Sequence, residues 1–253
     1  MIASTPFRIL VINPNTSTAI TETFKPLLSK LSLPNTSLSY WTCPTGPPII
    51  KTLAHMYESA SHCIPLLLDI VDDYDGFLAA CYADHPLVRL LQSYVADKPV
   101  VGIFDASISA ALTLVSTQTK FGILTTGQPF ETLLTEGVKH LLQSEGGTRA
   151  DDWRHFGGVA ASGVSLDDTR FEAKAKVMEA TYKLVQNGTI NVICIGGVIL
   201  SGMEGWVHEA CEAALGPEKG RQVKVIDQLL AGIWTLDAKL RHRQVKSYAS
   251  TLA

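Results

Sequence analysis

The 253-residue sequence has little charge of either sign and no run of basic residues. Charged side chains make up 18% of the chain, and the formal net charge at pH 7 is only −3. Nucleic acids and anionic membrane surfaces attract clustered lysine and arginine side chains. We therefore expect neither nucleic acid nor a membrane among the partners.

Long hydrophobic runs are also missing. The first apolar run, Ile9–Ile12, is shorter than a signal-peptide core or a membrane span requires. The five cysteines are odd in number and widely separated, which disfavours a disulfide framework and favours a reducing compartment. These features predict a cytoplasmic protein.

The sequence lacks the short motifs that hold metals or nucleotides. CxxC, HxH and HExxH patterns are absent, and the seven histidines are scattered. The patterns GxGxxG, GxxxxGK[ST] and GxSxG are absent as well. We therefore expect no metal and no cofactor.

Short apolar or β-branched runs alternate with longer amphipathic stretches, which predicts an α/β fold with parallel sheets covered by helices. The expected strands are Arg8–Asn13, Leu38–Cys43, Gly76–Ala80, Val100–Phe104, Phe121–Thr125, Phe156–Ala161, Val192–Ile195 and Val223–Ile226. The expected helices are Ser17–Leu31, Thr52–Val71, Pro86–Ala96, Asp105–Ser116, Gln128–Ser144, Asp167–Asn187, Met203–Leu215 and Asp227–Tyr248. Pro65 should kink or interrupt the second of these helices.

A weak internal repeat divides the chain into two halves. Phe7–Asn13 resembles Lys120–Thr126, and Tyr74–Cys81 resembles Ile190–Gly197 at nearly the same spacing. We expect two similar lobes, one formed by residues 1–98 plus about 206–253 and the other by residues 99–205. A ligand would bind in the cleft between them, beyond the carboxyl ends of the strands.

The first candidate segment is Asn13–Ser17, which ends a strand and precedes a helix. Backbone N–H groups at a helix start favour an anion or a polarised carbonyl, so Asn15, Thr16 and Ser17 are candidate ligand-binding residues. The alternative is plain helix capping, an interpretation that we favour more for Ser17 than for Asn15.

Cys81 follows a buried strand and precedes Pro86, which suits the first turn of a helix. A thiol in this place gains thiolate character from nearby N–H groups, which makes Cys81 a candidate base or nucleophile. The alternative, a buried cysteine acting as a small hydrophobic side chain, suits Cys63, Cys194 and Cys211 better because these fall inside expected helices or a strand.

Two further segments occupy the matching turns of the second half. Thr125 and Thr126 offer hydroxyl groups beside an expected helix start, although threonine before glycine is also ordinary turn chemistry. Gly196 and Gly197 end a strand, where glycine lets a ligand approach the backbone closely.

Four segments, Arg8–Ser17, Ala80–Asp84, Pro99–Ile103 and Phe121–Thr126, together resemble the hydantoin/allantoin racemase family of the aspartate/glutamate racemase superfamily, and its fungal members in particular. The resemblance covers nearly the whole chain. It implies two pseudo-symmetric Rossmann-like lobes with an active site between them, no cofactor, a small-molecule substrate (a hydantoin, a ureide or a small carboxylate) and a homo-oligomer.

The same resemblance implies roles for individual residues. In the family, two cysteines act on opposite faces of the substrate α-carbon. Cys81 matches the first cysteine, and Gly197 stands where the second is expected. The implied substrate contacts are Asn15, Thr16, Ser17, Tyr82, Ala83, Thr125, Thr126, Gly196 and Val198.

Glycine at position 197 removes one of the two proton donors that racemisation needs, and a positioned acid or base is typically worth about 10²–10⁴-fold in rate. Three explanations stay open: an engineered replacement of cysteine, natural one-sided chemistry by Cys81, or substitution by Cys194. The leading hypothesis is an isomerase-family enzyme that acts on a hydantoin- or allantoin-like ring through Cys81. The alternatives are a decarboxylase or cis–trans isomerase of a small carboxylate that uses Cys81 alone, and a non-catalytic ligand-binding relative.

Overall fold

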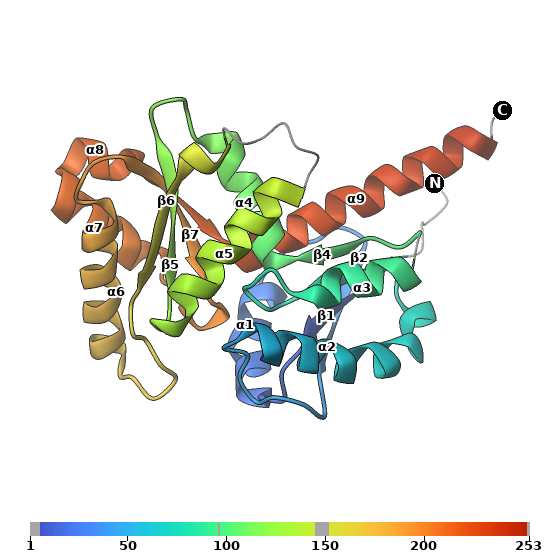
Figure 1. Cartoon of the computed structure of the whole chain (residues 1–253). Coiled ribbons are helices and arrows are strands. Elements are labelled where there is room, and N and C mark those ends of the chain that lie inside the picture. Colours follow the sequence, from blue (N-terminus) through green and yellow to red (C-terminus); the bar gives the residue numbers. More distant parts are fainter. Residues whose placement is uncertain (1–5, 96, 145–151, 252–253) are drawn as a thin grey trace. The chain divides into compact units, whose positions relative to one another are not determined.

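The computed structural model describes residues 6–95, 97–144 and 152–251 (Figure 1). The chain divides into two compact units. Unit 1 comprises Met1–Cys81, His85–Ile103 and Gly232–Ala253, and unit 2 comprises Tyr82–Asp84 and Phe104–Ala231.

Unit 1 contains a four-stranded parallel sheet in the order β2-β1-β3-β4. Its strands are β1 (Phe7–Asn13), β2 (Thr36–Thr42), β3 (Gly76–Ala79) and β4 (Val100–Gly102). The helices between them are α1 (Thr18–Ser29), α2 (Leu53–Leu68) and α3 (Pro86–Tyr94), with a short 3-10 turn at Val71–Asp73.

Unit 2 repeats this pattern with a parallel sheet in the order β6-β5-β7-β8. Its strands are β5 (Lys120–Thr125), β6 (Phe156–Ala161), β7 (Ile190–Gly196) and β8 (Lys224–Asp227). The helices between them are α5 (Pro129–Ser144), α6 (Arg170–Val185), α7 (Glu204–Leu215) and α8 (Pro217–Gln222), with 3-10 turns at Asp152–His155 and Val198–Leu200. The two sheets share one strand order, so the expected α/β fold with two related halves is confirmed.

Each half of the chain ends in a helix that is assigned to the other unit. Helix α4 (Ile103–Leu114) follows β4 and belongs to unit 2 from Phe104 onward, and α9 (Gln228–Thr251) follows β8 and belongs to unit 1 from Gly232 onward. A Cβ added at Gly232 would lie 2.7 Å from Leu78 Cδ1, so α9 packs closely on β3.

The observed boundaries differ from the expected ones for a physical reason. Residues from about 206 were expected in the first lobe, but β8 pairs with β7, which keeps residues 206–231 in unit 2. Residues 99–103 were expected in the second lobe, but β4 pairs with β3 and belongs to unit 1.

The strands of each unit pack against helices in an apolar core. In unit 2, Ile193 and Ile195 of β7 contact a cluster that includes Val177 of α6 and Val207 of α7. Figure 1 shows α6 and α7 side by side along this sheet. In unit 1, the corresponding cluster joins β1 and β3 to α2 and α3. Strands buried on both faces in this way present continuous apolar runs, which is why the sequence indicates them clearly.

Helix α2 is not interrupted at Pro65. Pro65 and Ser61, whose carbonyl loses its helical partner, are both exposed, and water can take the missing bond. One local expectation is wrong. The strand expected at Val100–Phe104 ends at Gly102, because α4 begins at the next residue. Helix α8 is an addition that the sequence did not indicate.

Candidate active site

Two segments with candidate residues follow strands at the carboxyl edge of the unit 1 sheet. The Ala80 N–H donates to the Ile12 carbonyl over 2.8 Å, and the Cys43 N–H donates to the Asn13 carbonyl over 3.0 Å. The pairing of β1 with β2 and β3 therefore brings the residues after Asn13 and after Ala80 to neighbouring places on this edge.

The Asn13–Ser17 turn is held by asparagine side chains. Asn13 Nδ2 donates to the Ser17 carbonyl and to Thr21 Oγ1, each over 3.0 Å. Asn15 Oδ1 accepts the Ser17 N–H over 2.9 Å. Ser17 occupies the N-cap position of α1, but its side chain makes no capping bond.

The interpretation that assigned the local structural role to Ser17 rather than to Asn15 is therefore wrong. The side chain of Asn15 is buried and shapes the turn, whereas Thr16 and Ser17 are half-buried. A short amide that bonds to a backbone N–H two residues later is the usual way in which asparagine stabilises a turn.

Cys81 differs from the other cysteines. All five lie in the described part of the chain, and Cys81 alone is partly exposed while Cys43, Cys63, Cys194 and Cys211 are buried. Loss of water around the thiol raises the pKa of Cys81 to about 12. This direction is opposite to the expected thiolate character.

His85 caps the start of α3. The Leu87 N–H donates to His85 Nδ1 over 3.1 Å, and the Val88 N–H donates to the His85 carbonyl over 3.2 Å. Pro86 occupies the first turn, as expected. His85 thus takes these first amide donors, and loss of water keeps the resting Cys81 side chain a neutral thiol.

Gly196 is a packing position in unit 2. An added Cβ would lie 2.6 Å from Ile123 Cγ2 and 2.8 Å from Tyr82 Cε1, distances that real Cβ atoms do not show. The Gly196 carbonyl accepts a hydrogen bond from Thr125 Oγ1 over 2.7 Å, so the buried Thr125 hydroxyl joins the ends of β5 and β7.

Tyr82 is a buried anchor within unit 2. Its hydroxyl lies 2.9 Å from Ser107 Oγ, and its ring makes an edge contact with Phe104 at 5.3 Å between centroids. Burial raises the pKa of Tyr82 well above its ordinary value, so the phenol is neutral. The neighbouring Ala83 is buried as well.

Gly197 has space that Gly196 lacks. Its φ of 161° is extended backbone that any residue can adopt. An added Cβ would meet only the Thr126 side chain within 4 Å, with 3.2 Å to Cγ2 and 4.0 Å to Oγ1. Val198 is buried and begins the 3-10 turn that follows. Position 197 can therefore hold a small side chain if Thr126 shifts slightly.

Cys194 lies in the core of unit 2. Its Sγ donates to the Ser107 carbonyl over 3.6 Å, and burial raises its pKa to about 12. The side chain is fully enclosed. This placement speaks against Cys194 as a replacement for the missing second cysteine.

Two residues that the sequence interpretation did not single out hold the end of β5. The N–H and hydroxyl of Ser162 both donate to the Thr125 carbonyl, over 2.7 Å and 2.9 Å. The Gly163 N–H donates to the Thr126 carbonyl. The sequence signal was a serine–glycine pair directly after an expected strand, the same signal that singled out the other turns.

Among the described residues, no group of three or more histidine, cysteine, aspartate or glutamate side chains is arranged to hold a metal ion. Within the same part of the chain, no helix has the length and apolar character that a bilayer crossing demands.

Residues 9–236 match the family model described as Asp/Glu/Hydantoin racemase. The chain belongs to this family. An uncharacterized protein of Schizosaccharomyces pombe is 34% identical over 239 residues, which cover 92% of each chain.

Solved structures share the fold. The crystal structure of an allantoin racemase from Pseudomonas fluorescens superposes with a TM-score of 0.74 at 21% identity, over 92% of this chain and 91% of that one. A maleate cis–trans isomerase from Nocardia farcinica, solved as a C194S mutant in that protein's numbering with a covalently bound succinylcysteine intermediate, has a TM-score of 0.59 at 17% identity over 93% of each chain.

Proposed function

We propose that this racemase-family protein acts on a hydantoin- or allantoin-like ring by transferring the α-proton through Cys81, on one face of the ring only. The observation that carries the proposal is the contrast between the two family cysteine positions. Cys81 is a partly exposed residue that carries a thiol, and position 197 carries none. The likeness to an allantoin racemase in fold supports a ureide ring as the substrate.

The two family cysteine positions differ in what they can supply to the reaction. In the proposed reaction Cys81 is the base, and Gly197 supplies no second one. Amides that follow Thr125 hold the polar atoms of the ring and the enolate that forms when the proton leaves.

The proposed reaction needs one sulfur. The Cys81 thiolate takes the proton from the ring α-carbon, and the electron pair of the C–H bond moves into the enolate. The resulting thiol exchanges its proton with solvent and then returns a solvent-derived proton to the same face of the carbon. The hydrogen is thereby exchanged with solvent while the configuration is retained, because no group at position 197 protonates the other face.

Isomerisation or decarboxylation of a small carboxylate by Cys81 alone is the second candidate. The observation that favours it is the same glycine, because these reactions need no second thiol. A covalent succinylcysteine in a maleate isomerase of the same fold shows that a cysteine of this fold can act by addition in that protein. A ligand-binding protein without turnover is the third candidate.

The experiment that separates these candidates is hydrogen exchange in heavy water. Each enantiomer of allantoin and of a 5-substituted hydantoin is incubated with the protein, and the α-proton is followed by NMR against an enzyme-free sample. We expect the α-proton signal to disappear while optical rotation is retained. Exchange with inversion would indicate a working two-face racemase, and binding without exchange a non-catalytic protein.

Two variants assign the activity to the sulfur. Cys81→Ala should abolish exchange, whereas Cys211→Ala, which removes a thiol from the apolar core of unit 2, should retain it. Full exchange by Cys81→Ala would reject the site assignment. Conversion of maleate or decarboxylation of a malonate-type acid, without exchange of either ring, would favour the second candidate.

A further inference from the structure

The loop of residues 162–169, here called the β6–α6 loop, clamps the end of β5. Ser162 donates twice to the Thr125 carbonyl, and the Gly163 N–H donates to the Thr126 carbonyl. Thr125 and Thr126 are the residues of β5 and its following turn for which we predict ligand contacts. The position of these residues therefore depends on the β6–α6 loop.

The β6–α6 loop is itself internally bonded. The Val164 N–H donates to Ser162 Oγ over 3.3 Å, and the Ser165 N–H donates to Asp168 Oδ2 over 2.8 Å. Gly163 has a φ of +77°, a left-handed conformation that favours glycine. The Val164 side chain is buried in the core formed with α6 and β7. Because these amides already have partners within the loop, the loop supports the neighbouring turn instead of offering them to a ligand.

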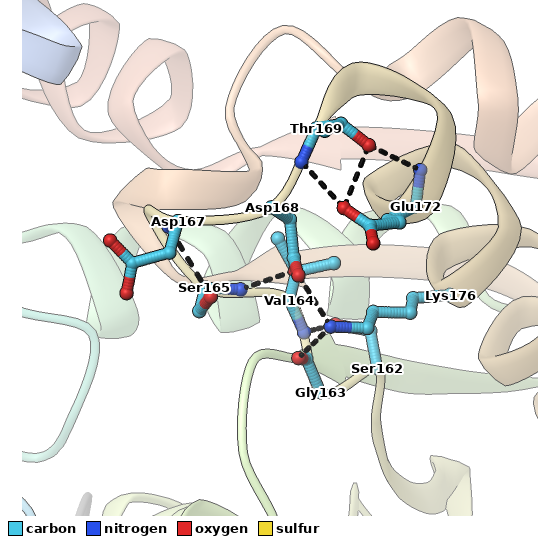
Figure 2. Close-up of polar contacts among 9 residues, drawn as sticks. All are labelled: Ser162, Gly163, Val164, Ser165, Asp167, Asp168, Thr169, Glu172 and Lys176. Carbon is cyan, nitrogen blue, oxygen red and sulfur yellow. Dashed lines mark hydrogen bonds and ion pairs between the residues drawn. The ribbon is translucent and has the colours of Figure 1, made fainter.

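Lys176 of α6 ties the β6–α6 loop together. Thr169 and Glu172 form a capping box that fixes the start of α6. A helical side chain tilts toward the helix N-terminus, so Lys176 reaches back to the loop. Its Nζ donates to the Gly163 carbonyl over 3.1 Å and pairs with Asp168 Oδ1 at 2.6 Å, as Figure 2 shows.

The ion pair is charged at neutral pH. Lys176 and the Ser165 N–H together hold the pKa of Asp168 below its ordinary value. Each carboxylate oxygen of Asp168 thus has its own donor, and the Lys176 ammonium bridges this carboxylate to the Gly163 carbonyl. Charge-assisted hydrogen bonds of this kind are shorter and stronger than neutral ones.

We propose that Lys176 is a positioning residue, which fixes the β6–α6 loop and through it the ligand-binding geometry of Thr125 and Thr126. This inference rests on the proposed function for its catalytic consequence. The structural part of the inference, that Lys176 holds Gly163 and Gly163 holds Thr126, rests on the hydrogen bonds alone. Lys176 does not touch the ligand, and its loss should weaken binding more than it slows the chemical step.

The test compares Lys176→Met, which keeps the length of the side chain and removes its charge, with Lys176→Arg and Lys174→Met. Lys174 lies on the same helix and pairs with Glu209 of α7 at 2.7 Å, so it controls for the loss of one lysine. Thermal unfolding first establishes that all variants fold. Amide hydrogen exchange of the peptide spanning residues 160–170 and the KM and kcat for ring α-proton exchange are then measured.

For Lys176→Met we expect faster amide exchange in this peptide and a KM raised about three- to thirtyfold, with kcat changed less. Lys176→Arg should bring both the amide exchange rate and KM part of the way back to the wild-type values. Lys174→Met should resemble the wild type. If the wild type exchanges ring protons and Lys176→Met leaves KM unchanged, the inference is overturned. If the wild type turns over no substrate, the proposed function fails. In that case, unchanged amide exchange in Lys176→Met would by itself overturn the proposal that Lys176 fixes the β6–α6 loop.

Discussion

Restoring a thiol at position 197 should convert one-sided exchange into racemisation. The extended φ of 161° accepts a cysteine, and the nearest obstacle to its Cβ is Thr126 Cγ2 at 3.2 Å. Overpacking of this kind costs about 1–3 kcal/mol where the neighbour cannot move. Thr126 is only partly buried, and Thr126→Ser removes the methyl group altogether. The most informative protein is therefore Gly197→Cys combined with Thr126→Ser.

A second positioned acid should raise the inversion rate by about 10²–10⁴-fold over the wild type. The decay of circular dichroism of a single ring enantiomer measures inversion, and NMR in heavy water measures exchange in the same sample. Gly197→Ser with Thr126→Ser is the matched control, because a serine hydroxyl of similar size ionises far less readily than a thiol. A folded double variant whose new thiol reacts with a disulfide reagent, yet whose inversion rate equals that of the wild type, would refute the reasoning.

Three further predictions concern packing and ionisation. Gly196→Ala should lower the free energy of unfolding by about 1–3 kcal/mol in urea titrations, because its Cβ meets Ile123 and Tyr82; Gly205→Ala, which meets nothing within 4 Å, should not. The rate of ring exchange should rise about tenfold per pH unit between pH 7 and 10, because the fraction of Cys81 present as thiolate rises about tenfold per unit below its pKa of about 12. A rate that does not depend on pH would contradict this prediction. Burial raises the pKa of Cys211 to about 12, so the unfolded chain loses this proton first and stability falls as pH rises above about 9. Cys211→Ala should remove up to about 1.4 kcal/mol per pH unit of that fall, and an identical slope in both proteins would contradict the assignment.

The sequence predicted the local elements well because their signals are local. The apolar runs of all eight strands are present near their expected places, and the strand order repeats in the two sheets as the internal similarity suggested. Pairing of β8 with β7 could not be predicted in this way. It depends on where a strand finds its partner across the fold, and no nearby residue encodes that choice.

The candidate residues show the same limit. That a thiol stands after β3 is visible in the sequence, but the direction of its pKa shift depends on desolvation in the folded protein. Gly196 and Gly197 look equivalent in the sequence, yet only one faces packed side chains. Asn15, and not Ser17, bonds the backbone with its side chain, because side-chain geometry within a five-residue turn decides which residue does so.

Selective alkylation of Cys81 tests the central claim most directly. The protein is treated at mildly alkaline pH with increasing amounts of iodoacetamide, from substoichiometric to excess. The modified residues are identified by peptide mass spectrometry, and ring exchange is measured on the same samples. We predict that label accumulates on Cys81 before the four buried thiols, that a bound ring substrate slows it, and that activity falls in proportion to the label. Full activity in protein whose Cys81 is completely alkylated would contradict the account.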